Sequence, residues 1–79
     1  MIDIKEFIKI LTSEFDIESD FILTPDTSFR SIKDWSSMHG LIIIAMADSE
    51  FGVTITGNDL RQMSTIQELY NLIKSRKEQ

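Results

Sequence analysis

The chain has 79 residues, of which 42% are hydrophobic and 27% are charged. This composition is that of a globular protein and excludes an intrinsically disordered one. A chain of this length forms a single domain, residues 1–79, and hides only about 60% of its unfolded surface. Because little room is left beside the core for an enclosed active site, we expect the function at the surface and do not expect an enzyme.

The charge balance is acidic, with 13 acidic and 8 basic residues and a formal net charge of -5. Five of the acids fall in a short stretch without any base: Glu14, Asp16, Glu18, Asp20 and Asp26. Such a surface repels nucleic acid and anionic lipid and attracts basic protein patches. Nucleic acid is therefore not expected as a partner.

The absence of cysteine excludes disulfides, thiolate metal sites and a cysteine nucleophile, and a single histidine offers little to zinc. The segment Met1–Glu6 is charged and lacks the features of a signal peptide. The longest apolar stretch, Leu41–Ala47, is far shorter than the roughly 20 residues that cross a bilayer. We expect a monomeric cytoplasmic protein that starts near Met1 and does not insert into membranes.

An amphipathic helix is predicted from Ile4 to Glu14. Its apolar stripe consists of Ile4, Phe7, Ile8, Leu11 and Phe15. Asp3 and Glu6 have the spacing of a capping box at its start.

Residues 16–35 predict a long loop that is pinned to the core at intervals. The pinning side chains are isolated apolar residues: Ile17, Phe21, Ile22, Leu23, Phe29, Ile32 and Trp35. A loop of this length in so small a domain is usually functional or packed by its own side chains.

A second helix is predicted from Ser36 or Ser37 to Phe51. Asp34, Ser36 and Ser37 are all competent N-caps, and Gly52 suits the left-handed conformation that ends a helix. The β-branched run 42–44 would also fit a buried strand. Helix is favoured because the apolar stretch continues beyond this run and no other segment offers a comparable partner strand.

The remaining chain predicts a short extended link at Val53–Thr56, one helical turn within Gly57–Met63 and a last helix from Ser64. Ser64 and Gln67 have capping-box spacing. The helix carries an apolar stripe and a basic C-terminal turn that complements its dipole: Ile66, Leu69, Tyr70 and Ile73, then Lys74, Arg76 and Lys77. The expected fold is an all-α bundle of three main helices and one short helix.

Catalytic patterns are almost absent. His39 lies two residues from Ser37, so the two side chains point in different directions on a helix and do not form a nucleophile and base. No Gly-rich phosphate loop occurs, and no carboxylate pair is placed in an apolar environment. What remains is a serine at a helix start, where free N–H groups and the dipole would stabilise a phosphate ester, although serine there is also a routine cap.

The segment 23–38 contains Pro25 and Phe29 and ends Trp35-Ser36-Ser37-Met38. With this segment the chain resembles the acyl carrier protein family, whose members carry 4'-phosphopantetheine on a serine at the head of the second helix. The segment is similar to the loop and attachment motif of the family's branch that reads Trp-Asp-Ser-Leu. Downstream, the segments 50–55 and 64–66 are similar to its Glu-Phe link and the entry to its final helix. These matches need no gap and, with the first helix, cover essentially the whole chain.

The resemblance implies that Ser37 carries covalent 4'-phosphopantetheine, attached by a phosphopantetheinyl transferase that holds the magnesium. Met38 matches the family's leucine, while Ser36 replaces its aspartate and is expected to be a cap. Asp34 is expected to supply part of the missing negative charge. The further partners implied are acyl-loading ligases and synthase or transferase enzymes.

Two further sets of residues follow from the resemblance. The residues expected to be recognised by partner enzymes are Asp34, Trp35, Ser36, Met38, His39, Ile42 and Met46. Since His39 and Ile42 stand where the family carries acids, apolar contact through Met38, Ile42 and Met46 is expected to matter more than charge near Ser37. The alternative is that these side chains only pack against the long loop. The residues expected to part for an acyl chain, from a core that is collapsed in the unloaded form, are Ile44, Ala47, Phe51, Ile55, Leu60, Met63 and Ile66.

Three functions remain open at this point. The leading one is an acyl carrier for fatty acid, polyketide-like or related synthesis. The second is an aminoacyl or peptidyl carrier, which uses the same attachment. The third is an unmodified acidic helical interaction module, which the replacement of aspartate by Ser36 makes credible.

Overall fold

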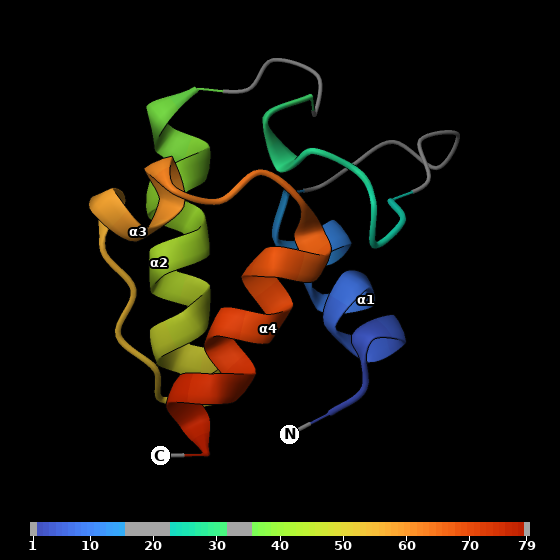
Figure 1. The fold of residues 1–79 in the computed structure, drawn as a ribbon, viewed down its shortest axis with the longest axis vertical. Helices are drawn as coiled ribbons and strands as arrows, with labels where there is room; N and C mark the ends of the chain where they lie inside the picture. Colours follow the sequence, from blue (N-terminus) through green and yellow to red (C-terminus); the bar gives the residue numbers. More distant parts are fainter. Residues whose placement is uncertain (1, 16–22, 32–35, 79) are drawn as a thin grey trace.

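The computed structural model describes residues 2–15, 23–31 and 36–78. Within these ranges the elements are α1 (Ile4–Phe15), the 3-10 turn η1 (Phe29–Ser31), α2 (Ser37–Phe51), α3 (Gly57–Arg61) and α4 (Ile66–Lys77). Their only β pairing is an isolated bridge between Ser28 and Thr65. The predicted all-α fold of three main helices, one short helix and a loop between the first two main helices is confirmed (Figure 1).

The ends of α1 and α2 follow from the capping residues that the sequence predicted. The Glu6 N–H donates to Asp3 Oδ1 at 2.9 Å, which stabilises the start of α1. Ser36 is the N-cap of α2, and Gly52 ends this helix with a left-handed φ of 65°. The Gly52 N–H bonds to the Asp48 carbonyl and the Val53 N–H to the Ala47 carbonyl, both at 3.0 Å, so the turn at this glycine gives partners to carbonyls at the end of α2. The helical interpretation of residues 42–44 is therefore confirmed.

The N-cap of α4 differs from the prediction by one residue, and the helix begins at Ile66 rather than Ser64. Thr65 is the N-cap, and its side chain accepts a hydrogen bond from the Glu68 N–H at 3.1 Å. The Glu68 carboxylate in turn accepts from the Thr65 N–H at 3.2 Å. The predicted capping box of Ser64 and Gln67 is therefore wrong. Glu68 is the residue whose side chain bonds back to the N-cap, and the Gln67 side chain donates to Asn71 instead.

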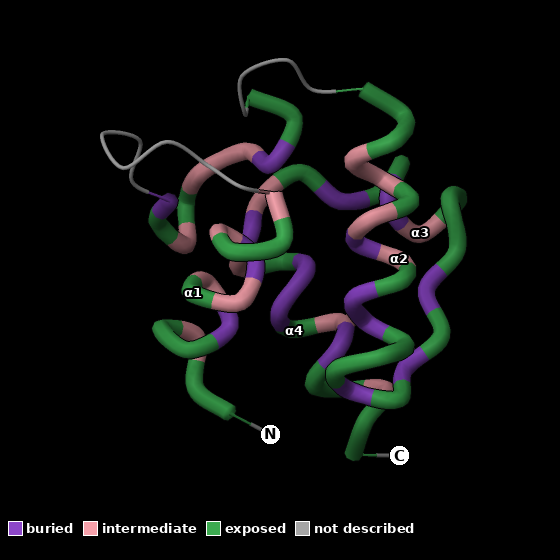
Figure 2. Tube along the Cα trace, turned by 180° about the vertical axis from the view of Figure 1, so that it is seen from behind, coloured by how far each residue is buried: buried purple, intermediate pink, exposed green. Residues whose placement is uncertain are grey.

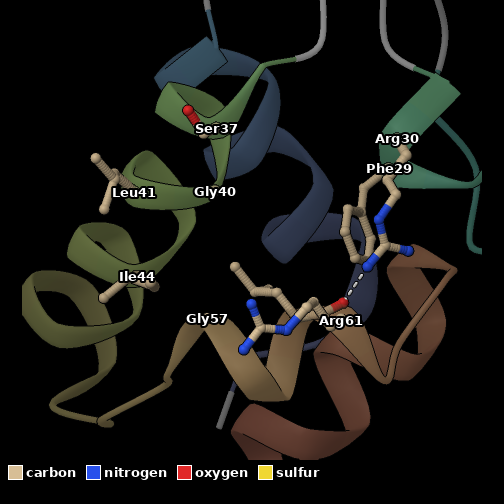
Figure 3. A pocket seen from close by; sticks show the side chains of 9 residues that line it. Phe29, Arg30, Ser37, Gly40, Leu41, Ile44, Gly57 and Arg61 are labelled. Atoms are coloured by element: carbon tan, nitrogen blue, oxygen red, sulfur yellow. Dashed lines mark hydrogen bonds between the residues drawn. The ribbon is translucent and has the colours of Figure 1, made fainter.

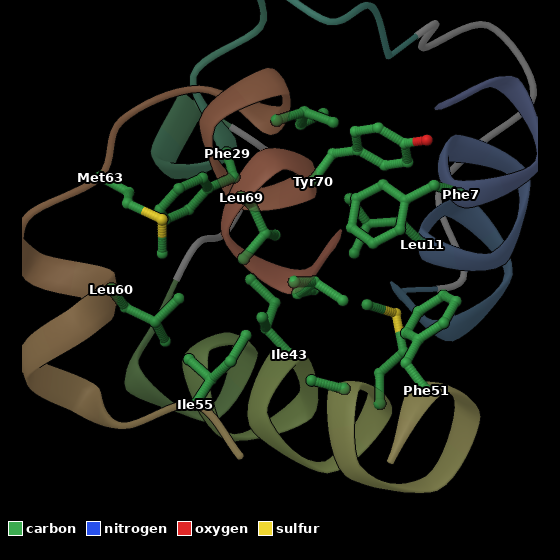
Figure 4. Packing of buried hydrophobic residues seen from close by; sticks show 14 of the residues in the cluster. Phe7, Leu11, Phe29, Ile43, Phe51, Ile55, Leu60, Met63, Leu69 and Tyr70 are labelled. Atoms are coloured by element: carbon green, nitrogen blue, oxygen red, sulfur yellow. The ribbon is translucent and has the colours of Figure 1, made fainter. Parts of the chain in front are cut away.

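The core is one cluster of apolar side chains drawn from all four helices, the link after α2 and the loop before it (Figure 4). At its centre the Phe7 ring lies 5.8 Å from the ring of Phe51 and 5.5 Å from that of Tyr70, measured between centroids. The Tyr70 hydroxyl donates to the Ile2 carbonyl at 2.7 Å, so it remains bonded at the edge of the core. The burial pattern along the chain is drawn in Figure 2.

Two connecting segments, 52–56 and 23–31, pack against α2 and the start of α4, respectively. The link 52–56 buries Val53 and Ile55 and runs back along α2, so that α3 lies beside the N-terminal half of α2 (Figure 1). The loop segment 23–31 bonds to the start of α4 through the Phe29 N–H and the Pro25 and Thr27 carbonyls. Leu23 and Phe29 are buried as predicted, and the other five pinning residues lie outside the described ranges.

An ion pair ties α3 to the C-terminal end of α4. Arg76 donates from both terminal nitrogens to the Asp59 carboxylate, at 2.7 and 3.0 Å, and from one of them to the Thr54 carbonyl at 2.9 Å. The hydrogen bond from Arg76, with a further one from the Thr56 N–H, holds the pKa of Asp59 well below its usual range. Lys77 donates to the Phe51 carbonyl, so two of the three basic residues predicted to complement the α4 dipole also fix neighbouring segments.

None of the described helices has the length and apolar character needed to cross a membrane.

The Asp59–Arg76 pair predicts a specific loss of stability in acid. In the unfolded chain the Asp59 carboxylate is protonated near the ordinary aspartate pKa of about 4, whereas in the folded protein it is protonated at a lower pH. The stabilisation is therefore fully present above about pH 4 and is lost as the pH falls toward the depressed pKa. In thermal unfolding measured between pH 7 and pH 2, Asp59→Asn should lower Tm at pH 7. It should also make the fall of Tm with decreasing pH less steep.

The matched control is Asp48→Asn, because Asp48 is an exposed acid whose side chain pairs with no described residue. This variant should keep the acid decline of the parent. Equal pH profiles for the two variants would contradict the assigned role of Asp59.

Candidate functional site

Ser37 is the first residue of α2 and is exposed. The N–H groups of a first helical turn have no partners within the helix, and the dipole makes this end positive. The first turn of α2 contains no acidic residue. An anionic group on the Ser37 hydroxyl would therefore meet a favourable field.

Ser36 and His39, one residue before and two residues after Ser37, cap the helix. The Ser36 N–H donates to His39 Nδ1 at 3.1 Å, and the Ser36 hydroxyl lies 3.3 Å from the same nitrogen. His39 thus takes the part that a glutamate or glutamine plays in an ordinary capping box. Its ring also packs edge-on against Phe15 of α1, with 5.3 Å between centroids. The histidine therefore fixes the start of α2 and joins it to α1.

A cavity of about 370 Å³ opens beside Ser37, between α2, α3 and the 3-10 turn (Figure 3). Its lining consists of Phe29, Arg30, Ser37, Gly40, Leu41, Ile44, Gly57, Leu60 and Arg61. Most of these residues are apolar or glycine. The volume lies in the range of small-molecule sites in proteins.

The four α2 residues in this lining share one helical face. Ser37, Gly40, Leu41 and Ile44 have the spacing i, i+3, i+4 and i+7. α3 packs against α2 at Gly40, where an added Cβ would lie 3.5 Å from Leu60 Cδ1, an ordinary van der Waals distance. The face that presents the serine is thus also the face against which α3 packs.

Arg30 fixes the wall of the cavity opposite α2. Its guanidinium donates to the Met63 carbonyl at 2.6 Å and also to the Leu60 carbonyl. It lies over the Phe29 ring, 4.8 Å from the centroid. Because the last carbonyls of a helix lack partners within it, these bonds hold the end of α3 against the loop before α2.

The residues predicted for partner recognition differ in how far they are exposed to solvent. Ser36 and Met38 are exposed, with Met38 at 66%, while His39 and Ile42 are half-buried. Met46 is only 1% exposed, so the prediction of a surface contact is wrong for it: this side of α2 faces the core. Asp34 and Trp35 lie outside the described residues.

The residues predicted to surround an acyl chain also divide into two groups. Ile44 and Leu60 line the cavity beside Ser37. The others are buried in the core and are not part of this lining: Ala47, Phe51, Ile55, Met63 and Ile66. Their movement to admit a chain stays a prediction.

Leu41, Arg30 and Arg61 are site residues that the sequence analysis did not identify. Leu41 is 65% exposed and lies one turn after Ser37 on the same face. Its spacing from Ser37 was the signal that would have identified it. The two arginines come from segments distant in sequence, and no local pattern indicates their place.

No cluster of three or more potential metal-ligating side chains occurs among the residues that the structure describes. No protein-family model matches the chain, and no curated protein matches it significantly. The function is therefore inferred from the site itself.

Replacing Arg30 tests whether it holds the cavity wall. Arg30→Ala removes the donors to the Leu60 and Met63 carbonyls, and we expect the free energy of unfolding to fall by about 1 kcal/mol because water replaces these bonds in part. Arg61→Ala is the matched control, since Arg61 is exposed and bonds to no described side chain or carbonyl. It should change stability by less than about 0.5 kcal/mol. Urea unfolding measures both, and equal effects would contradict the role of Arg30.

Proposed function

We propose that this chain is an acyl carrier protein that bears 4'-phosphopantetheine on Ser37. One observation carries the proposal: an exposed hydroxyl stands at the N-terminus of a 15-residue helix and at the rim of a mostly apolar cavity of about 370 Å³. A hydroxyl in this position is reachable by a modifying enzyme. The motif resemblance around Trp35-Ser36-Ser37-Met38 supports the same residue.

The residues at the site fit the phosphate end of such an arm. The positive dipole end of α2 favours a phosphodiester on Ser37 Oγ, as at other helix N-termini that bind phosphate. No acid of that turn opposes it. The attached arm supplies a thiol that carries an acyl group as a thioester.

The protein itself contributes a surface that partner enzymes can bind and a cavity that can cover the acyl chain. Met38 and Leu41 follow Ser37 on α2 with about two thirds of their surface exposed, so a partner that approaches the hydroxyl meets two large apolar side chains. They suit contact with the transferase that attaches the arm and with the enzymes that load and use the acyl group. The cavity would cover part of a short acyl chain and limit its contact with water.

The mostly apolar cavity lining supports an acyl payload, and the proposed role is fatty acid, polyketide-like or related acyl synthesis. The proposed location is the cytoplasm. An aminoacyl or peptidyl carrier is the alternative, since the attachment would be the same. In an unmodified interaction module, Met38 and Leu41 would bind a protein partner and Ser37 would carry nothing.

The attachment predicts a defined change of mass. The purified chain, incubated with coenzyme A, Mg²⁺ and a broad-specificity phosphopantetheinyl transferase, should gain the mass of one phosphopantetheine group. Ser37→Ala should gain nothing, and the matched variant Ser36→Ala should be modified as the parent is. Circular dichroism checks that both variants fold. No gain in the parent would favour the interaction module, and a gain in Ser37→Ala would move the site to Ser36.

Leu41 is expected to contribute to recognition by the transferase. A partner that reaches Ser37 also reaches the side chain one turn away, and loss of an apolar contact of this size costs about 1–2 kcal/mol. Leu41→Ser should therefore lower kcat/KM of the transferase roughly tenfold. Ala45→Ser, an exposed change one turn further along α2, should have little effect. Equal rates for Leu41→Ser and the parent would exclude Leu41 from the docking surface.

A further inference from the structure

Among the described residues that line the cavity beside Ser37, the charged ones are all basic. Of the nine residues that line it, Arg30 and Arg61 are charged, and no described acid is among them. This is unexpected in a chain with a net charge of -5. A guest that contacts these walls is therefore favoured if it brings a negative charge.

The two arginines are not equivalent. Arg30 directs its terminal nitrogens at the Leu60 and Met63 carbonyls and serves the wall itself. Arg61 forms no ion pair or hydrogen bond with a described side chain. The one acid in its own helix, Asp59, is held by Arg76. Arg61 is thus the cation of this cavity whose donors are available to a guest.

The position of Arg61 selects which part of a guest it meets. Figure 3 places its side chain beside Gly57, toward the Ile44 end of the cavity, with Ser37 at the other end. Ser37 and Ile44 are seven residues apart on α2, which corresponds to about 10 Å of helix rise. A phosphodiester bonded to Ser37 Oγ stays at the first end. An anion that meets Arg61 is therefore not this phosphodiester and must belong to another part of the guest.

We propose that the cavity selects an acyl group whose apolar chain ends in a carboxylate, with Arg61 as the residue that binds the carboxylate. This inference rests on the proposed carrier function and names its class of payload. The guanidinium fork of arginine matches a carboxylate with two parallel hydrogen bonds. The half-buried Ile44 and the buried Leu60 line the cavity together with Ser37 and Arg61 and would cover part of the apolar chain from water.

The test attaches model guests without any transferase. The chain contains no cysteine, so Ser37→Cys provides a single thiol at the attachment position. The probes are the 2-pyridyl disulfides of ω-mercapto-octanoic acid and of octanethiol. The thiolate attacks the disulfide, a mixed disulfide forms on the protein, and pyridine-2-thione leaves and reports completion. The two probes match in length and differ in whether they end in a carboxylate or a methyl group.

At neutral pH and low salt, the carboxylate probe should raise Tm by a few degrees relative to the methyl probe in Ser37→Cys. The difference should vanish in Ser37→Cys with Arg61→Gln and should shrink in high salt. Arg61→Lys should retain part of it. No difference between the probes, or a difference that persists with Arg61→Gln, would overturn the proposal.

This result is independent of the mass-gain experiment. If Ser37 takes up phosphopantetheine but the two probes behave alike, the carrier function stands and the carboxylate assignment fails. If the probes differ through Arg61 but no arm can be attached to Ser37, the carrier function fails, and with it the assignment of the carboxylate as a carried payload.

Discussion

The position of α3 beside the N-terminal half of α2 depends on two arginines that approach this short helix from opposite ends. Arg30 binds the carbonyls of Leu60 and Met63 at its C-terminal end, and Arg76 binds Asp59 in its first turn. A five-residue helix is not stable on its own, because nucleation costs more than so few backbone bonds return. Contacts from outside α3 must therefore hold it in place.

The candidate site follows from this arrangement. With α3 packed at Gly40, the face of α2 that presents Ser37 becomes one wall of a cavity, and Leu60 and Arg61 become part of the opposite wall. The same helix therefore offers a modifiable hydroxyl at its positive end and a sheltered apolar surface below it. The proposed carrier function needs both features together, because an arm requires an accessible anchor and its payload benefits from cover.

The fold could be predicted from the sequence largely because its signals are local. Asp3 and Gly52 mark helix ends by their own conformational and hydrogen-bonding preferences, and both act as predicted. The N-cap of α4 was predicted one residue early because Ser64 and Thr65 could each cap the helix. The position of Glu68, which accepts a hydrogen bond from the Thr65 N–H, decides between them. For α2 the local signal fails: the helix is apolar nearly all round, so periodicity did not show that Met46 faces the core and Leu41 faces solvent. Arg30 and Arg61 reach the site through tertiary packing, which no spacing in the sequence encodes.

The central claim is that the hydroxyl of Ser37 carries a covalent arm in the living cell. The intact mass of the protein purified from the cells that naturally make it, followed by fragmentation of the peptide that contains Ser36 and Ser37, tests this most directly. The account predicts a fraction heavier by one phosphopantetheine group, with the added mass localised to Ser37. A protein found wholly unmodified, or modified at another residue, would contradict it.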